Sequence, residues 1–278
     1  MAILKASGEI VPFSKEKLTK SMLKAGASYT IIEEILHEIE LSLHHKTTTN
    51  QIYKKAFRLL KLYSKPIAAR YKLKKAIAQL GPSGYPFERF MAEILNFQGY
   101  QTQLNQLIPG RCVNHEVDVL ARNDHELIML ECKFHNRAGY KSDIKVPLYI
   151  KARFDDLKNE WQKLESVRDL HMQAWIATNT RFSEDAIKYA KCAGLHLISW
   201  DYPSHGSLRE RIDLAGLYPL TCLSSLSKGD KHRLLHAKNM VLCKDLLRNP
   251  MALHELGLKT RETHKVLKEI NELLAFKA

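Results

Sequence analysis

The residues best placed to do chemistry lie in HEVDVLARNDHELIMLECK, residues 115–133. Two apolar runs, VDVLA and LIML, contain or adjoin three charged side chains: Asp118, Glu131 and Lys133. Two carboxylates in a partly apolar setting repel each other unless a positive group compensates them, and a hard cation such as Mg²⁺ or Mn²⁺ fits that role. Such an ion polarises a phosphodiester oxygen and acidifies a bound water, while a neighbouring ammonium stabilises developing charge. The types and spacing therefore indicate metal-assisted phosphodiester hydrolysis.

Two adjacent strands, joined by the polar link RNDHE, must position these residues. Side chains alternate faces along a strand, so Glu131 and Lys133 point the same way and Cys132 points the opposite way. Pairing Ala121 with Glu126 across a four-residue link, or Arg122 with His125 across a two-residue link, sets Asp118 opposite Met129 and diagonal to Glu131, on one face. The spacing thus predicts that the three charges converge. The alternative is a salt-bridged sheet edge with Lys133 paired to Glu131.

Helices and strands on both sides of this pair complete an α/β arrangement. PFERFMAEILNFQGY (86–100) has apolar residues at helical spacing, and residues 150–164 repeat that spacing after a loop. QAWIAT, SEDAIKYAKCAG and LHLISW then predict a strand, a helix and a strand. Strands that alternate with helices in this way favour an α/β layer.

The segment from Tyr85 to Asp201 resembles the Mrr-like restriction endonucleases of the PD-(D/E)xK superfamily. YPFERFMAEILNFQGY, EVDVL, LECK and AWIATNTRFSEDAIKYAKCAGLHLISWD carry the resemblance. It implies an α-β-β-β-α-β core within a restriction-endonuclease-like α/β/α domain, DNA cleavage and dependence on Mg²⁺.

The same resemblance implies a role for each motif residue. Asp118 and Glu131 would be catalytic and would bind the metal, Lys133 would be catalytic, and the Cys132 carbonyl would be a further metal ligand. Glu88, in the first helix, would reach the metal through water. A solvated helix residue is the alternative for Glu88.

Residues 1–81 form a separate predicted module of one short hairpin and about four helices. The hairpin is expected to turn at Ser7-Gly8, and GPSGY (81–85) marks the boundary to the next domain. Each predicted helix starts at a capping or first-turn signal. The first starts at Ser14, the second at a capping box of Thr30 and Glu33, and the third at Thr48 or Thr49. The fourth starts near Pro66 and runs to Leu80.

ILKASGEIVPFSKEKLTKSMLKAGA, followed by AARYKL, resembles the ATP-cone, a nucleotide-sensing module. Lys5 on the first strand and Lys17 in the first helical turn can converge near a helix N-terminus, which already favours anions. The resemblance implies an ATP or dATP site, with Arg70 less clearly involved, lined by Ile3, Lys5, Ser14, Lys17 and Thr48. The alternative is a basic helical module that docks DNA or a partner without nucleotide.

Residues 213–278 show no strand signal and predict a small helical bundle. They weakly resemble a helix-hairpin-helix or SAM-like bundle, in which HELGLKTRE would meet phosphate; a plain interaction bundle is the alternative. His232 and His236 are spaced as zinc ligands near Cys243, but no second ligand pair accompanies them, so a solvated histidine face is expected.

Composition limits the function classes. Lys5 and Glu9 rule out a secretory signal at the N-terminus, and no apolar run is long enough to cross a bilayer. Five cysteines, none in a CxxC pair, fit a reducing cytoplasm. The net charge of +13 divides into +9 for residues 1–80, zero for 81–212 and +4 for 213–278. This distribution suggests basic flanking modules that meet polyanions.

We therefore expect an α/β multi-domain protein with an ATP-cone-like domain (1–81), a nuclease domain (82–212) and a helical tail (213–278). By resemblance it would be a cytoplasmic Mg²⁺- or Mn²⁺-dependent endodeoxyribonuclease that ATP or dATP regulates. The expected partners are DNA and further copies of the chain, in a homodimer or higher homo-oligomer, and not a membrane. The alternatives are a catalytically inactive, nucleotide-responsive DNA-binding regulator and an RNA-processing nuclease.

Overall fold

The computed structural model describes residues 1–5, 8–44, 47–137 and 139–275. Internal contacts divide the chain into two compact units. Unit 1 comprises Met1–Ala76, Leu220–Arg233 and Cys243–Ala278, and unit 2 comprises Ile77–Pro219 and Leu234–Leu242. Most of the predicted first and third domains thus falls in unit 1, and most of the second falls in unit 2.

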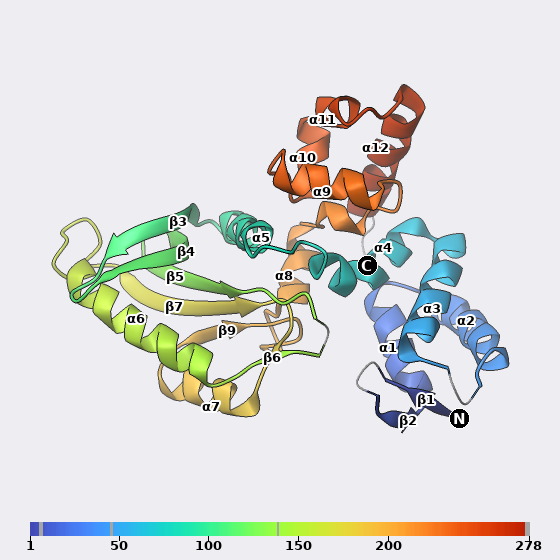
Figure 1. Ribbon diagram of the computed structural model, residues 1–278, viewed down its shortest axis with the longest axis horizontal. Coiled ribbons are helices and arrows are strands. Elements are labelled where there is room, and N and C mark those ends of the chain that lie inside the picture. Colours follow the sequence, from blue (N-terminus) through green and yellow to red (C-terminus); the bar gives the residue numbers. More distant parts are fainter. Residues whose placement is uncertain (6–7, 45–46, 138, 276–278) are drawn as a thin grey trace. The chain divides into compact units, whose positions relative to one another are not determined.

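Unit 2 is built on a five-stranded mixed sheet with the strand order β3-β4-β5-β7-β9 (Figure 1). The strands are β3 (Gln101–Pro109), β4 (Asn114–Arg122), β5 (Glu126–Lys133), β7 (His171–Thr178) and β9 (His196–Ile198). β3, β4 and β5 pair antiparallel, whereas β5, β7 and β9 pair parallel. Parallel neighbours need crossover connections, and helices lie within both of them.

The helices of unit 2 are α5 (Tyr85–Phe97), α6 (Lys145–Trp161), α7 (Glu184–Cys192) and α8 (Leu208–Ala215). Two short strands, β6 (Lys141–Ser142) and β8 (Arg181–Phe182), form a separate parallel pair. The order α5-β3-β4-β5-α6-β7 is the α-β-β-β-α-β succession that the resemblance implies. The pattern of the residues alone predicts only two of the three strands; the additional one, β3, has alternating exposed and half-buried positions.

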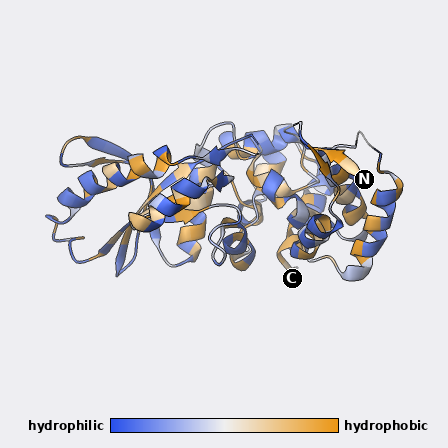
Figure 2. Ribbon diagram, turned by 90° about the horizontal axis from the view of Figure 1, so that it is seen from below, coloured by the Kyte–Doolittle hydropathy of each residue, from blue (hydrophilic) through white to orange (hydrophobic). Residues whose placement is uncertain are grey.

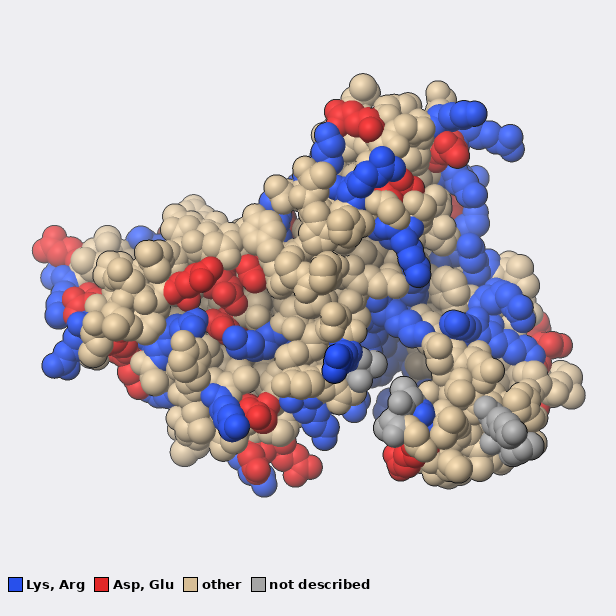
Figure 3. Space-filling view, viewed as in Figure 1, with Lys and Arg blue, Asp and Glu red and all other residues tan. Residues whose placement is uncertain are grey.

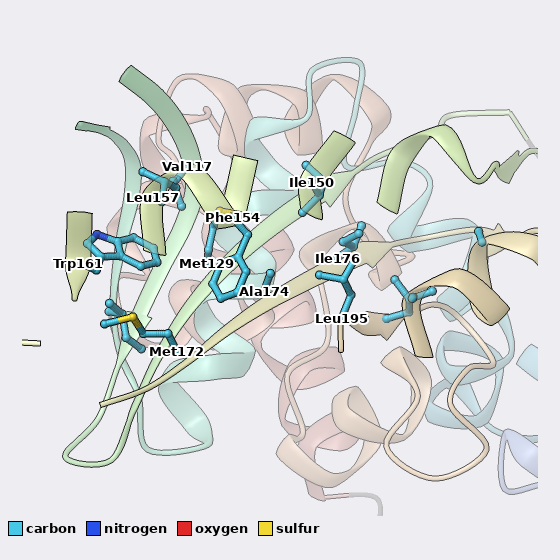
Figure 4. Packing of buried hydrophobic residues seen from close by; sticks show 14 of the residues in the cluster. Val117, Met129, Ile150, Phe154, Leu157, Trp161, Met172, Ala174, Ile176 and Leu195 are labelled. Atoms are coloured by element: carbon cyan, nitrogen blue, oxygen red, sulfur yellow. The ribbon is translucent and has the colours of Figure 1, made fainter. Parts of the chain in front are cut away.

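One hydrophobic core joins α6 and α7 to the sheet (Figure 4). Its side chains come from alternate positions of β5 and β7 and from positions three or four apart on α6, including Met129, Ala174, Ile150, Phe154 and Leu157. Burying each large apolar side chain contributes about 1.5–3 kcal/mol. This packing holds α6 against the strand that carries Glu131.

Unit 1 contains the predicted hairpin and mostly helical chain. The hairpin joins β1 (Ala2–Leu4) to β2 (Ile10–Pro12), and Ser7 of its predicted turn lies outside the described residues. The elements that follow are α1 (Lys15–Lys24), α2 (Tyr29–Leu41), α3 (Thr49–Tyr63), α4 (Lys65–Ile77), η1 (Leu220–Cys222), α9 (Lys228–His236), α10 (Cys243–Arg248), α11 (Met251–Glu255) and α12 (Thr260–Ala275). Helices carry apolar and polar residues on different sides, as the hydropathy colouring shows (Figure 2).

Local signals predict the helix starts with one error. Ser14 caps α1 and Thr48 caps α3, the latter in a capping box with Gln51. The predicted capping box of Thr30 and Glu33 is wrong, because α2 starts earlier and Ser28 caps it by accepting a hydrogen bond from the Ile31 amide. α4 begins at Lys65, next to Pro66 as predicted, but it ends at Ile77, short of the predicted Leu80. Throughout the described ranges, every helix is too short or too polar to serve as a membrane span.

Candidate active site

The pairing of β4 with β5 brings Asp118 level with Glu131. The paired positions run from Arg122↔Leu127 to Val119↔Leu130, so the next step of this register sets Asp118 opposite Glu131. The predicted register, with Asp118 opposite Met129, is wrong, because Met129 pairs with Leu120. Four residues, 123–126, link the paired positions. The side-chain oxygen of Asn123 accepts hydrogen bonds from the backbone amides of His125 and Glu126, and these bonds close the turn. The link has an even length, as the alternation requires. It spans residues 123–126, one residue later than the four-residue link that would pair Ala121 with Glu126.

Glu131 lies at the centre of a charge cluster. Its side chain is only 6% exposed, and a buried carboxylate is costly unless it is paired. Lys133 Nζ donates to Oε1 at 2.5 Å, and Arg153 Nη1 of α6 donates to Oε2 at 2.6 Å. The ion pair expected from a salt-bridged sheet edge is therefore present, together with a second cation.

Sequence reasoning missed Arg153, although a signal for it existed. It lies on α6 three residues after Ile150 and next to Phe154, both of which pack into the core. It also donates to the Glu116 carbonyl at 2.9 Å and to the Tyr149 hydroxyl at 3.1 Å. Its position between core residues of the helix signals a cation that needs a buried acid, but only the packing of α6 against the sheet makes Glu131 that acid.

Asp118 is half-buried and turns its carboxylate to the backbone of β5. Its Oδ2 accepts a hydrogen bond from the Cys132 amide at 2.7 Å. Burial raises the pKa of Asp118 from its usual 3.8 to about 7, with repulsion from Glu131 as the next cause; the Cys132 hydrogen bond opposes both effects. Among the described residues, the Cys132 amide and Lys133 compensate this carboxylate only in part, which is the condition under which a cation stabilises a site.

Glu88, in the first turn of α5, lies at the margin of the same cluster. Burial raises its pKa, and Glu116 and Glu131 add to the rise, while a hydrogen bond from Asn105 lowers it. Asn105 is level with Asp118 on β3 and adopts a left-handed φ of 50°, which Asn tolerates better than most residues. Its amide donates to Glu88 Oε2 at 3.1 Å, so this backbone irregularity connects α5 to the site.

The side chains and backbone of the cluster supply only part of the oxygen shell of a hard divalent cation. Asp118 and Glu131 supply carboxylate oxygens, and Cys132 could supply a main-chain carbonyl; its thiol is buried, which raises the pKa of that thiol well above its usual value. In the described ranges no cluster of three or more His, Cys, Asp or Glu side chains is arranged to hold a metal. Mg²⁺ commonly takes one or two carboxylates and completes its shell with water and substrate phosphate, so a two-carboxylate site fits that ion.

Four of the five predicted nucleotide-site residues of unit 1 line one pocket of about 240 Å³. Ile3, Lys5, Ser14 and Lys17 line it; Thr48 and Arg70 are not among its described lining residues, but Thr49 is. The hydroxyl of Ser14 accepts a hydrogen bond from the backbone amide of Lys17 at 3.2 Å, and the ammonium of Lys5 forms an ion pair with Glu9 at 2.7 Å. The pocket brings the predicted cations to one place.

Two aromatic residues of this pocket escaped sequence reasoning. Tyr53 and Tyr71 stack with ring centroids 5.1 Å apart, and the ammonium of Lys75 lies 3.5 Å from the Tyr53 ring centroid. The Tyr53 hydroxyl is buried without a hydrogen-bond partner among the described residues. Burial raises the pKa of Tyr71 to about 12 and raises that of Tyr53 further, so both hydroxyls are neutral at physiological pH.

The C-terminal helices carry no metal cluster in the described ranges, which include His232, His236 and Cys243. HELGLKTRE connects α11 to α12 through Gly257, whose φ of 87° requires glycine-like freedom. Two helices with a tight connection are therefore present where the hairpin is expected.

Comparison with known proteins places the chain in a family. Residues 218–274 match a family model described as AF1548-like, C-terminal. Over 185 residues the chain is 36% identical to an uncharacterized protein of Archaeoglobus fulgidus, an alignment that covers 66% of this chain and 99% of the relative. The crystal structure of the protein of unknown function AF1548 matches with a TM-score of 0.56 and 34% identity, over 69% of this chain and 98% of that one. The names of these proteins state no activity. The chain belongs to the AF1548-like family.

Proposed function

We propose that this protein is a metal-dependent DNA endonuclease of the Mrr-like PD-(D/E)xK type. One observation carries the proposal: Asp118 is level with Glu131 on adjacent strands, and Lys133 bonds to Glu131 from the same strand face. Two carboxylates and an ammonium at one point of a sheet are the groups that hydrolysis of a phosphodiester requires.

The residues have separate tasks in this proposal. Asp118, Glu131 and the Cys132 carbonyl would hold the cation, which supplies charge neutralisation and an acidified water when bound. Lys133 would leave Glu131 to hold the attacking water or to stabilise charge on the phosphate. Arg153 keeps its bond to Glu131 Oε2 and so fixes the orientation of that carboxylate. Glu88 would reach the same cation through water.

Affinity for DNA would come mainly from basic surface outside the carboxylate cluster. Lys and Arg side chains are spread over unit 1, whereas acidic and basic side chains are interspersed on the visible face of unit 2 (Figure 3). Phosphate contacts of this kind give sequence-independent binding that salt weakens. The pocket of Lys5, Lys17, Tyr53 and Tyr71 would bind ATP or dATP and regulate cutting, as an ATP-cone would.

Nicking of supercoiled plasmid tests the proposal. The wild type is incubated with Mg²⁺, Mn²⁺ or EDTA beside Asp118→Ala, and Asp124→Ala serves as the control because Asp124 is an exposed carboxylate in the link between the same strands. We expect nicking only with metal and a loss of about 1000-fold in Asp118→Ala, equal to about 4 kcal/mol of transition-state stabilisation. Nicking of equal rate in Asp118→Ala would reject the site. Matched RNA substrates separate DNA from RNA cleavage.

A second candidate is a catalytically inactive DNA-binding regulator. The observation in its favour is that Lys133 and Arg153 occupy both oxygens of Glu131. It predicts DNA binding that EDTA does not change and no cleavage with any divalent metal.

A further inference from the structure

The chain that leaves β5 directly after Lys133 lines a polar pocket of about 290 Å³, near the lower end of the range for small ligands. We name it the loop pocket; its lining residues are Pro82, Phe134, His135, Asn136, Arg137 and Tyr140. All of them belong to unit 2. The charge cluster around Glu131 uses none of these residues.

Buried polar side chains hold the wall of the loop pocket in place. The side-chain oxygen of Asn179 accepts a hydrogen bond from the backbone amide of His135 at 2.8 Å, and the side-chain nitrogen of Asn179 donates one to the His135 carbonyl at 2.7 Å. Thr178 Oγ1 donates to the Lys133 carbonyl at 2.7 Å. Asn179 and Thr178 are 3% and 0% exposed, so these bonds form where an unpaired polar group is costly. The backbone from Lys133 to His135 is thereby fixed relative to β7.

The ring of His135 is fixed as well. Its Nε2 lies 3.2 Å from the hydroxyl of the fully buried Ser142, and its ring centroid is 4.0 Å from that of Tyr140. Burial, with the nearby Lys133, lowers the pKa of His135, which favours the neutral imidazole. His135 therefore acts as a support on which the half-exposed ring of Tyr140 rests.

Close packing also fixes the floor of the pocket. A Cβ on Gly81 would lie 2.5 Å from Phe134 Cε1, so only glycine permits this approach of the two chain segments. Phe134 in turn packs on Phe87 of α5, with ring centroids 5.7 Å apart. The apolar floor and the aromatic wall are preorganised.

Arg137 is the unsatisfied cation of the loop pocket. It is exposed, and within the described ranges no carboxylate or other acceptor is bonded to its guanidinium. A planar guanidinium beside an exposed aromatic ring suits a phosphate and a stacked base, the two parts of a nucleotide. Lys133 and Arg137 are four residues apart, so their Cα atoms are at most about 14 Å from each other, which equals about four nucleotide steps along one strand.

We propose that the loop pocket binds a nucleotide of the DNA strand next to the scissile phosphodiester, with Arg137 on its phosphate and Tyr140 against its base. The proposal rests on the proposed endonuclease function and adds a substrate-binding subsite to it. It would set the register of the strand over Lys133.

Binding without metal gives the first test. The full chain, Arg137→Ala and Arg137→Lys are titrated with a labelled duplex in EDTA at several salt concentrations. Arg111→Ala is the matched control, because Arg111 is an exposed arginine of the same unit at the turn between β3 and β4. We expect Arg137→Ala to raise Kd about tenfold and to lower the salt slope by about 0.9, with partial recovery in Arg137→Lys. An unchanged slope in Arg137→Ala would overturn the proposal.

Phosphate interference gives the second test and separates the two proposals. Duplexes that carry one neutral methylphosphonate are cut with Mg²⁺, and the distance from each cut to the neutral linkage is mapped. In the wild type, cuts at one fixed distance within about four nucleotides should be depleted, and Arg137→Ala should abolish that depletion only. Cleavage whose pattern does not depend on Arg137 would overturn the subsite and leave the endonuclease standing. If the wild type cuts no DNA, the proposed function itself fails.

Discussion

The carboxylate cluster of unit 2 and the nucleotide pocket of unit 1 both collect charged side chains, but they treat those charges differently. Glu131 is buried and held by two cations from different elements, whereas Lys5 and Glu9 form an exposed pair four residues apart. Exposed pairs contribute little to stability, and breaking a buried pair is costly. The difference teaches that buried ion pairs fix the carboxylate of Glu131 in place, while the pair of Lys5 and Glu9 in unit 1 is open to solvent.

Removal of Arg153 should produce the largest loss in the free energy of unfolding, because it breaks a buried ion pair. Arg153→Ala leaves one oxygen of the buried Glu131 without its cation, so we expect a loss of about 2–4 kcal/mol in the free energy of unfolding. Urea denaturation of the full chain measures it. Lys151→Ala is the control on the same helix, because its pair with Asp155 is more exposed and should contribute less than about 1 kcal/mol. If both variants lost the same free energy of unfolding, the buried ion pair of Glu131 would be no more stabilising than the exposed one, and the contrast would be wrong.

Replacement of Asp118 should change stability with a definite pH dependence. The pKa of about 7 in the folded chain exceeds the usual 3.8, so between these values the folded state keeps a proton that the unfolded state loses. Wild-type stability therefore falls as pH rises through this window. Asp118→Asn keeps an acceptor for the Cys132 amide without the charge, and we expect it to exceed the wild type by about 1–3 kcal/mol above pH 7 and to match it near pH 4.

Urea denaturation in EDTA at pH 4, 6 and 8 follows this difference. Asp124→Asn, on the exposed link, should show no such trend. The difference in free energy of unfolding between Asp118→Asn and the wild type could instead stay constant with pH. That result would show that folding does not raise the pKa of Asp118.

The smallest effect is expected in unit 1, on binding and not on folding. Lys17→Ala should raise the Kd for ATP or dATP about tenfold, or about 1.4 kcal/mol, and change stability by less than about 0.5 kcal/mol. Calorimetry measures the first quantity. Lys20→Ala, an exposed lysine of the same helix outside the pocket lining, is the control. No heat with either nucleotide in the wild type would remove nucleotide binding from unit 1.

Much of the fold could be predicted from short stretches of sequence. Alternation along β5 places Glu131 and Lys133 on one side, and the structure bonds them to each other. Ser14 caps its helix as predicted, because a cap depends on amides only two or three residues away. The order of α5, β4, β5, α6, β7, α7 and β9 follows in the same way from periodicity within each segment, whereas β3 does not.

Other features depend on contacts that no local pattern contains. Asn123 closes the link one residue later than expected, which moves Asp118 from a diagonal position to one level with Glu131. Arg153 reaches Glu131 only because the core packs α6 against β5.

By itself, the sequence determined which residues are charged, which strand faces they occupy and where most helices begin, since these depend on neighbours along the chain. The tertiary structure alone decided that Arg153 holds Glu131 and that Asn179 fixes His135 beside Arg137. Strand register and helix packing are set by the whole core, so residues far apart in sequence meet only after it has formed.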